Sequence, residues 1–400
     1  MSLRMPLAPL PRTDAARHWA GVATTSGVDF TPDRARELVA TATAGRTAAL
    51  LIAFASPAAD PSVLARALQD AAGTVPVVGT TTAGEISTGG ASSGGIVLMA
   101  LGGDGIHVAT SAATGASRDL RQAGATAAGA VDAVVGEHRI VLLLADGLVG
   151  DLQEVVRGAY DVAGAAVPLV GGCAGDDGLM QCTFVLADGE AHTDVVLGVG
   201  LAADTPWGIG VAHGWRRVGE PMLVTRSEGT TVHSLDDAPA LDVYLRNLNA
   251  PPEATVDAAA FNRWAMCHPL GMSRRSGEEV RFIAGADFES RSLQCIASVP
   301  QSGLVWLMEG DCTSVMDATH AACAQALSAL GDRPPVAVLA FDCVARKGIL
   351  GDAGLAAEVD AITSAAPEAA VVGFYTYGEI ARVQGTSGFH NQTLVLLAMA

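Results

Sequence analysis

The chain has 400 residues, half of them hydrophobic, with a net charge of −18 at pH 7 and only 4% aromatic side chains. This length exceeds what one hydrophobic core usually supports, so two or three domains are expected. Clustered Lys and Arg side chains are what bind nucleic acid or an anionic membrane surface without sequence preference. The chain has no such cluster, which argues against both kinds of partner.

The seven cysteines show no CxxC spacing, and their number is odd. This favours reduced thiols in a cytoplasmic protein over a disulfide framework or a zinc site. We interpret residues 1–30 as a disordered lead, because prolines interrupt their beginning and no apolar stretch there reaches signal-peptide length. The longest apolar runs elsewhere are strand-length, so no membrane span is expected.

A first group of elements precedes residue 104. The apolar run at 48–56 predicts a strand, and 61–73, with Pro at its start and Gly at its end, predicts a helix. VVGTTTAGEI (77–86) begins as a second strand, and 96–103 is another. A strand, a crossover helix and a strand in this order predict a parallel pair, with the trailing strands forming hairpins on the sheet edge.

The same order recurs twice. A helix after residue 117, a strand at 140–147, a helix at 151–165 and LVGGCAGDD form the second unit. A helix after Cys312, a strand at 336–343, a helix at 352–367 and VVGFYTYGEI form the third, with its extra length in an RKGILG loop. Three helix–strand–helix–strand–strand–strand units predict an α/β fold of mixed sheets covered by helices.

Residues 205–310 do not fit this repeat. Their pattern predicts a strand-rich insertion, with amphipathic helices near residues 239–248 and 257–266. Four of the five tryptophans lie in this stretch, although the rest of the chain contains few aromatic side chains.

The repeated phrase places Gly, hydroxyl and carboxylate groups at the carboxyl end of a parallel strand, where α/β sheets bind ligands. Turns favour the same residue types without any ligand, and for a single copy of the phrase a structural turn is the simpler interpretation. The third copy differs because Tyr375 and Tyr377 join Thr376, and we expect the two rings to share one strand face. The candidate ligand-binding residues from the three copies are Thr82, Glu85, Cys173, Asp176, Tyr375, Thr376, Tyr377, Gly378 and Glu379.

FDCVAR ends the first strand of the third unit and places Cys343 and Arg346 at the same sheet edge. Arg346 could bind a ligand carboxylate through a bidentate fork while Glu379 receives an amine, which together would suit an amino-acid-like zwitterion. A simple Arg–Glu ion pair is the alternative. A cysteine nucleophile at Cys343 or Cys173 is a further alternative, but the sequence identifies no activating base. GxSxG, P-loop and HExxH motifs are absent.

Seven motifs in order resemble the FIST family of prokaryotic sensory proteins: VVGTTTAGEI, LVGGCAGDD, AHGWRRVGEPMLVT, LDDAPALDVY, HPLGM, FDCVAR and GFYTYGEIA. The resemblance implies a FIST N-terminal domain over 31–235 and a FIST C-terminal domain over 236–400. It implies a sensor of small molecules, with amino acids as proposed ligands, and we expect no enzymatic activity. The sequence contains no kinase, cyclase or chemoreceptor module, so we expect the signal to pass to a separate protein, unless the protein serves another purpose.

One branch of that family resembles a haem-binding nitric-oxide sensor that regulates a histidine kinase. That alternative needs an axial histidine, for which His268 is the first choice and His213 and His233 are the next. None of the three has a second histidine at metal-ligand spacing, so a structural role is the competing explanation for each.

Overall fold

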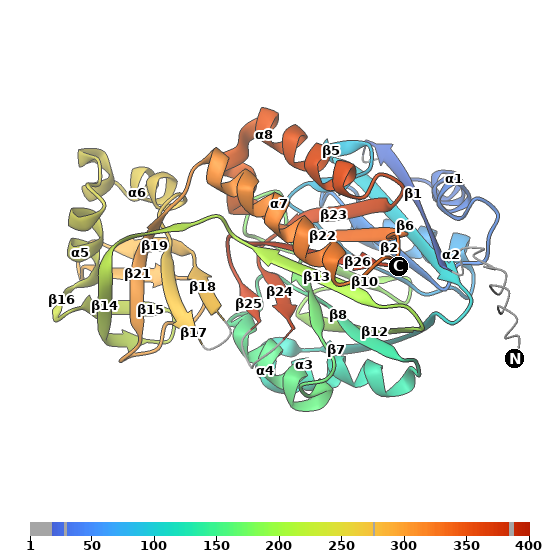
Figure 1. The fold of residues 1–400 in the computed structure, drawn as a ribbon, viewed down its shortest axis with the longest axis horizontal. Coiled ribbons are helices and arrows are strands. Elements are labelled where there is room, and N and C mark those ends of the chain that lie inside the picture. The colour runs from blue at the N-terminus through green and yellow to red at the C-terminus, as the bar shows by residue number, and fades with distance from the viewer. Residues whose placement is uncertain (1–17, 28–29, 275–276, 384–387) are drawn as a thin grey trace, which may run out of the picture.

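The computed structural model describes residues 18–27, 30–274, 277–383 and 388–400, and the body of the protein is built from three six-stranded sheets (Figure 1). The first has the order β1 (His18–Ser26), β6 (Gly95–Gly103), β2 (Leu50–Ala55), β3 (Val77–Thr81), β10 (Val185–Ala187), β11 (Glu190–His192). The second has the order β7 (His107–Thr114), β12 (Val195–Ala203), β8 (His138–Ala145), β9 (Leu169–Cys173), β24 (Glu379–Arg382), β25 (Phe389–His390). The third has the order β13 (Trp207–Ala212), β26 (Leu394–Met399), β22 (Ala337–Cys343), β23 (Ala370–Thr376), β4 (Glu85–Ser87), β5 (Gly90–Ser92).

The three sheets exchange hairpins in a cycle. Hairpin β4–β5 follows β3 of the first sheet in the chain but extends the third sheet, where Gly373 pairs with Ile86. In the same way β10–β11 extends the first sheet and β24–β25 extends the second. The trailing strands β6, β12 and β26 lie inside their sheets, so the expectation of edge hairpins was wrong for them, whereas β10 does form an edge hairpin with β11. Each sheet is completed by a neighbouring unit, which ties the three units together.

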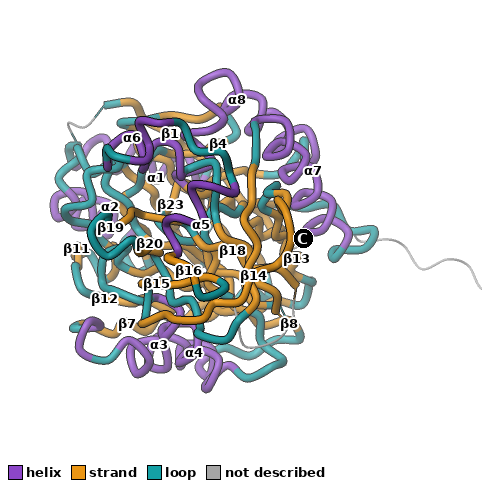
Figure 2. Tube along the Cα trace, turned by 90° about the vertical axis from the view of Figure 1, so that its left-hand side faces the viewer, coloured by secondary structure: helices purple, strands orange, loops and turns teal. Residues whose placement is uncertain are grey.

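A pair of helices covers the outer face of each sheet, and Figure 2 shows the helices around the outside of the strands. The pairs are α1 (Pro32–Thr43) with α2 (Pro61–Ala72), α3 (Leu120–Ala128) with α4 (Leu152–Ala163), and α7 (Cys312–Ser328) with α8 (Val344–Ala365); the 3-10 turns η1 (Ala116–Arg118) and η2 (Gly129–Ala133) flank α3. Side-chain caps start these helices where the sequence places Thr or Asp, as at Asp60, Asp151 and Asp311.

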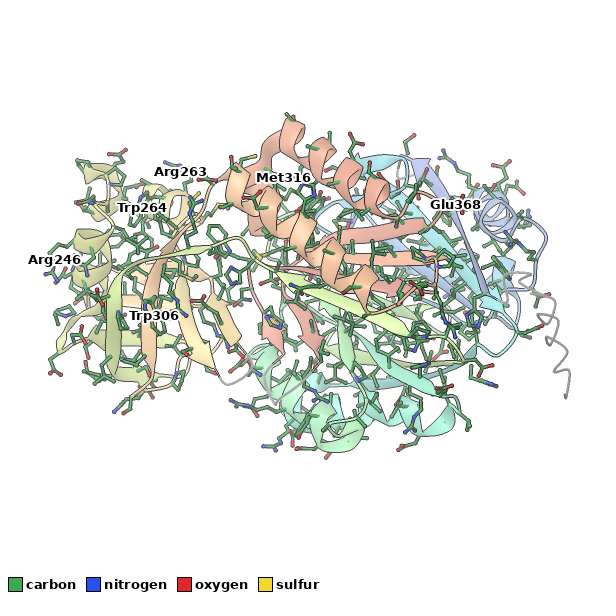
Figure 3. All side chains as sticks on the ribbon, viewed as in Figure 1. Arg246, Arg263, Trp264, Trp306, Met316 and Glu368 are labelled. Atoms are coloured by element: carbon green, nitrogen blue, oxygen red, sulfur yellow. The ribbon has the colours of Figure 1, made fainter. Side chains whose placement is uncertain are left out.

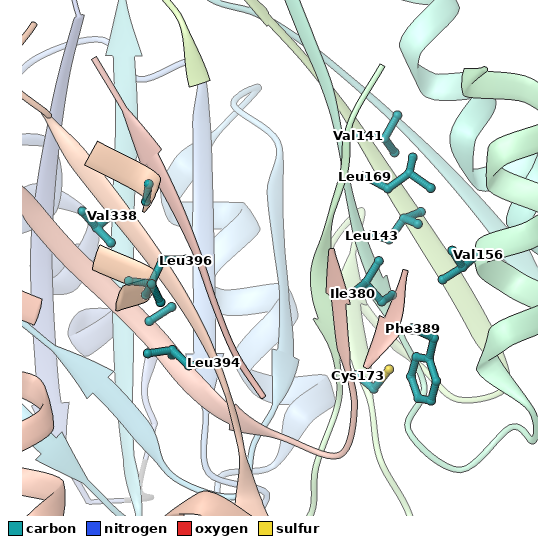
Figure 4. Packing of buried hydrophobic residues seen from close by; sticks show 14 of the residues in the cluster. Val141, Leu143, Val156, Leu169, Cys173, Val338, Ile380, Phe389, Leu394 and Leu396 are labelled. Atoms are coloured by element: carbon teal, nitrogen blue, oxygen red, sulfur yellow. The ribbon is translucent and has the colours of Figure 1, made fainter. Parts of the chain in front are cut away.

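The inner faces of the three sheets meet in one hydrophobic core. Phe54 of the first sheet lies 4.5 Å from Phe374 and 6.4 Å from Phe341 of the third, measured between ring centroids. The second sheet presents Gly172 to these two third-sheet rings. A further cluster lies on the outer faces, where Val156 of α4 packs beside Leu143 and Ile380 (Figure 4). Burial on both faces explains why the strands are continuous apolar runs.

The insertion forms a separate sheet with the order β18 (Gly277–Arg281), β17 (Leu270–Arg274), β21 (Leu304–Glu309), β14 (Arg216–Glu228), β15 (Thr231–Leu235), β20 (Ser292–Cys295), β19 (Ile283–Asp287), and β16 (Ala238–Pro239) pairs with β15. It is accompanied by α5 (Ala240–Asn247), η3 (Pro252–Thr255) and α6 (Ala258–Ala265). Tyr244 and Phe261 pack with Trp264, and Figure 3 shows that Trp264 and Trp306 both lie in this unit. The α/β class and the strand-rich insertion are therefore confirmed.

Two local expectations were wrong. Residues 18–26 are not a disordered lead, since β1 pairs with β6 along nine residues; residues 1–17 lie outside the described part. RKGILG is not a loop, because it forms the start of α8, which changes direction at Gly351 where φ is +57°. Among the described helices, none is both long and apolar enough to span a membrane.

Candidate functional site

The three copies of the repeated phrase meet one another through backbone hydrogen bonds. Ala83 N–H donates to Tyr375 O, and Tyr375 N–H donates to Gly84 O, at 2.9 and 2.8 Å. Gly175 N–H donates to Thr81 O, and Cys173 N–H donates to Gly378 O. Each copy is therefore bonded to both others, and the phrase is in the first place the junction of the fold.

The shared glycine of each copy is required by the neighbouring strand. A Cβ on Gly79 would lie 1.9 Å from Ala53 O, and one on Gly171 would lie 1.9 Å from Leu143 O. At Gly373 the corresponding distance, to Ala340 O, is 2.2 Å. No side chain fits so close to a carbonyl oxygen, so all three copies carry glycine for a packing reason.

The predicted acidic residues are buried and bonded to protein groups. Glu85 accepts hydrogen bonds from Thr82 Oγ1 at 2.7 Å and Ser92 Oγ at 2.9 Å, and its burial raises its pKa. Asp176 accepts from the Tyr377 hydroxyl and from three backbone N–H groups; burial opposes ionisation, but these bonds outweigh it and lower the pKa. Both residues hold turns in place.

Glu379 differs because one of its carboxylate oxygens is unused. Its Oε2 accepts from Thr393 N–H at 3.1 Å, whereas Oε1 has no hydrogen-bond partner among the described residues. Complete burial raises its pKa well above the usual range. Burial therefore disfavours the negative charge that was expected on Glu379 to receive a ligand amine.

Arg346 lies in a buried ion-pair cluster. Its Nε donates to Asp342 Oδ1 at 2.6 Å, and its Nη2 donates to Glu358 Oε1 at 2.5 Å and to Thr319 Oγ1 at 3.0 Å. Burial raises the pKa of Asp342 well above its usual range, Arg346 opposes this shift, and the neighbouring Glu358 adds to it. The guanidinium is occupied inside the protein, so we do not assign Arg346 to a ligand carboxylate.

The remaining predicted residues are also enclosed. Thr376 Oγ1 bonds the backbone of Cys173 and Gly378. Strand β23 ends at Thr376, and the two tyrosines do not share a face: Tyr375 packs under Lys347 Nζ, 5.1 Å from its ring centroid, whereas Tyr377 reaches the Asp176 turn. Burial raises the pKa of the Cys173 and Cys343 thiols well above the usual value, which makes both poor nucleophiles.

An open cleft of about 1010 Å³ lies immediately beside this enclosed cluster. The body contributes β13, α7 and the β24–β25 hairpin to its walls, and the insertion contributes β18, which contacts β25 (Figure 1). Thr393, whose N–H binds Glu379, lines the cleft, and Arg346 lies behind it with Nη1 donating to His213 O at 3.4 Å. The cleft is where a small molecule can reach this part of the protein.

Two histidines and three acidic residues line the cleft. His213 is half-buried, and its burial lowers its pKa to about 4; burial also lowers the pKa of His390. Glu278 pairs with Arg217 at 2.9 Å, Glu279 pairs with the buried Arg281, and Asp317 is exposed. Arg216 is a basic residue of the rim, paired with Asp311 at 2.7 Å.

Comparison with known families identifies the chain. A model of the FIST N domain matches residues 49–238, and a model of the FIST C domain matches residues 240–382. The chain belongs to the FIST family. FIST domains are associated with small-ligand sensing in signal transduction and are in general non-enzymatic. The chain is also similar to an uncharacterized protein of Methanocaldococcus jannaschii, with 30% identity over 126 residues; the match covers 28% of this chain and 24% of that protein.

The cleft of this FIST protein draws on both matched regions. His213 and Trp215 belong to the region matched by the FIST N domain, whereas Glu278 and Asp317 belong to the region matched by the FIST C domain. The wall of the cleft is reinforced by Trp215, whose indole N–H donates to Gln392 O at 2.9 Å. A ligand in this position contacts both regions at once.

The predicted haem ligand His268 lies in the insertion, beside α6. Its ring stacks on Trp264 at 4.5 Å between centroids, and its Nδ1 lies 2.8 Å from Trp264 O. It is not among the residues that line the cleft. His233 lies on β15 and does not line the cleft either. Haem ligation by His268 or His233 stays a prediction from the sequence.

Sequence reasoning missed most of the cleft. The sequence predicts His213 only as a candidate metal ligand, and it gives no prediction for His390, Glu278 or Asp317. The glycine of the HGW motif is the one local indication of a constrained turn beside His213. Gly214 has φ +83°, and a Cβ there would lie 2.4 Å from Ser314 O. His390 carries no such local signal, since its place in the cleft depends on the exchange of β24–β25 into the second sheet.

Proposed function

We propose that this FIST protein is a cytoplasmic sensor that binds a small amino-acid-like molecule in the cleft between the body and the insertion and passes the signal to a separate protein. The observation that carries the proposal is the cleft itself, about 1010 Å³ in volume and lined by both parts. This volume is near the upper end of the range typical of small-molecule sites.

The charges of the cleft suit a ligand that bears an amine. The exposed Asp317 offers a carboxylate to an ammonium group, and Glu278 offers one that it shares with Arg217, while the Glu279 carboxylate is used by the buried Arg281. At the rim, Arg216 offers a guanidinium toward the opposite end of a ligand. These residues would make the contacts to a ligand amine and carboxylate that the sequence predicts for Glu379 and Arg346.

The position of the cleft gives binding a route to a signal. The chain enters the insertion at β14 and returns to the body after β21. The insertion also packs on the body, where Gln392 Nε2 donates to Met266 O at 2.5 Å. A ligand that contacts both walls stabilises the relative position of body and insertion in which both contacts are made. Binding therefore shifts the equilibrium between the relative positions of these two parts.

Substitution Glu278→Gln is expected to weaken ligand binding about tenfold or more, because it removes the charge that faces the ligand amine. The measurement is isothermal titration calorimetry with a panel of L-amino acids. Asp161→Asn is the matched control, since Asp161 also pairs with an arginine, Arg121 at 2.8 Å, but does not line the cleft. A wild-type protein that binds no member of the panel would contradict the proposal.

A further inference from the structure

The hydrogen bonds of His213 determine which of its nitrogens carries the proton. Trp215 N–H donates to His213 Nδ1 at 3.0 Å, so Nδ1 is an acceptor and has no hydrogen. Because burial lowers the pKa of His213 to about 4, the ring is neutral at pH 7 and its proton is on Nε2. His213 lines the cleft, and its Nε2 makes no hydrogen bond to any residue in the described part of the chain, so its Nε2–H is an unused donor.

His390 has the same tautomer, but its nitrogen without a hydrogen bond to a described residue is Nδ1. Its Nε2 lies 2.9 Å from Ala381 O, and because a carbonyl only accepts, Nε2 carries the proton. Burial lowers its pKa as well, so the ring is neutral and Nδ1 is an acceptor. His390 lines the same cleft, near enough to His213 for the two rings to influence each other's protonation.

The charged groups around these rings disfavour an anionic ligand group. Of the acidic residues that line the cleft, Glu278 pairs with Arg217 and Glu279 pairs with Arg281, whereas Asp317 is exposed; the rim cation, Arg216, pairs with Asp311. Behind the wall, Arg346 is matched by Asp342 and Glu358. A ligand group beside the histidines therefore meets one neutral donor, one neutral acceptor and a surplus of negative charge.

We infer that the cleft selects its ligand through a primary carboxamide, whose oxygen accepts from His213 Nε2–H and whose N–H donates to His390 Nδ1. The inference rests on the proposed function, and it narrows the ligand class to amine-bearing molecules that also carry an amide, such as glutamine or asparagine. A carboxylate in the same place could accept from His213 but would leave His390 Nδ1 without a donor.

Matched ligand pairs test the inference on the wild-type protein. In calorimetric titrations at pH 7.5, L-glutamine should bind at least about tenfold more tightly than L-glutamate, and L-asparagine more tightly than L-aspartate. If the acids bind as tightly as the amides while Glu278→Gln still weakens binding, the amide inference is overturned and the proposed function stands. If no member of the panel binds, both are overturned.

Removing the donor should remove the preference. His213→Phe keeps a ring of similar size and should bring the amide-to-acid affinity ratio close to one, whereas Asp161→Asn should leave the ratio unchanged. A ratio that stays at the wild-type value in a folded His213→Phe protein contradicts the assignment.

Nuclear magnetic resonance of the histidine ring nitrogens tests the tautomers without any substitution. In the wild-type protein at pH 7, His213 and His390 should each carry a proton on Nε2 alone. Protonation of either ring on Nδ1 would overturn the inference.

Discussion

Substitution of Arg346 by methionine is expected to lower the free energy of unfolding by about 3–5 kcal/mol, because it leaves two carboxyl groups buried without their cation. Arg346, Asp342 and Glu358 are completely buried, and both acids bond the guanidinium directly. Urea denaturation followed by circular dichroism measures the loss. Arg121→Met is the control, since Arg121 pairs with Asp161 at the surface and its removal should have little effect.

A second variant separates charge from shape at the same site. When Asp342→Asn and Glu358→Gln are combined with Arg346→Met, most of the lost stability should return, because no unpaired charge is then buried. A triple variant no more stable than Arg346→Met would show that packing, rather than charge, explains the loss.

Substitution Gly171→Ala is expected to destabilise the fold by about 3 kcal/mol or more, since the new Cβ would lie 1.9 Å from Leu143 O in the paired strand. The backbone adds strain, because φ at Gly171 is +150°. Thermal and urea denaturation measure the effect. The control is Gly89→Ala in the turn of β4–β5, where the nearest atom to a new Cβ is Ser87 Oγ at 3.6 Å.

Equal stabilities of the Gly171→Ala and Gly89→Ala variants would contradict the packing explanation of the repeated glycine. The explanation also applies to Gly79 and Gly373, so alanine at either position should be costly for the same reason.

The sequence supports the fold class because hydrophobic patterning is local. Runs such as 50–55 and 337–343 are apolar because both faces of their strands are covered, and this is visible in the sequence. The exchange of hairpins could not be predicted, since nothing in residues 85–92 indicates that they join the third sheet rather than the first. Strand pairing over long sequence distances depends on the assembled fold.

The same limit explains the difference between the predicted site and the cleft. The phrase around Tyr375 and Glu379 combines residue types typical of a ligand site, but its groups bond one another in the interior. Turn chemistry and binding chemistry use the same residues, so the pattern alone does not distinguish them. The cleft combines His213 with His390, which are far apart in the chain and lie in no shared motif.

The central claim is that a ligand binds between the body and the insertion, and hydrogen–deuterium exchange measures this most directly. The wild-type protein would be compared with and without the tightest-binding amino acid of the panel. The account predicts slower exchange on both walls of the cleft, in residues 209–216 of the body and 278–281 of the insertion. Protection confined to residues 82–85 and 375–379, with none on the cleft walls, would contradict it.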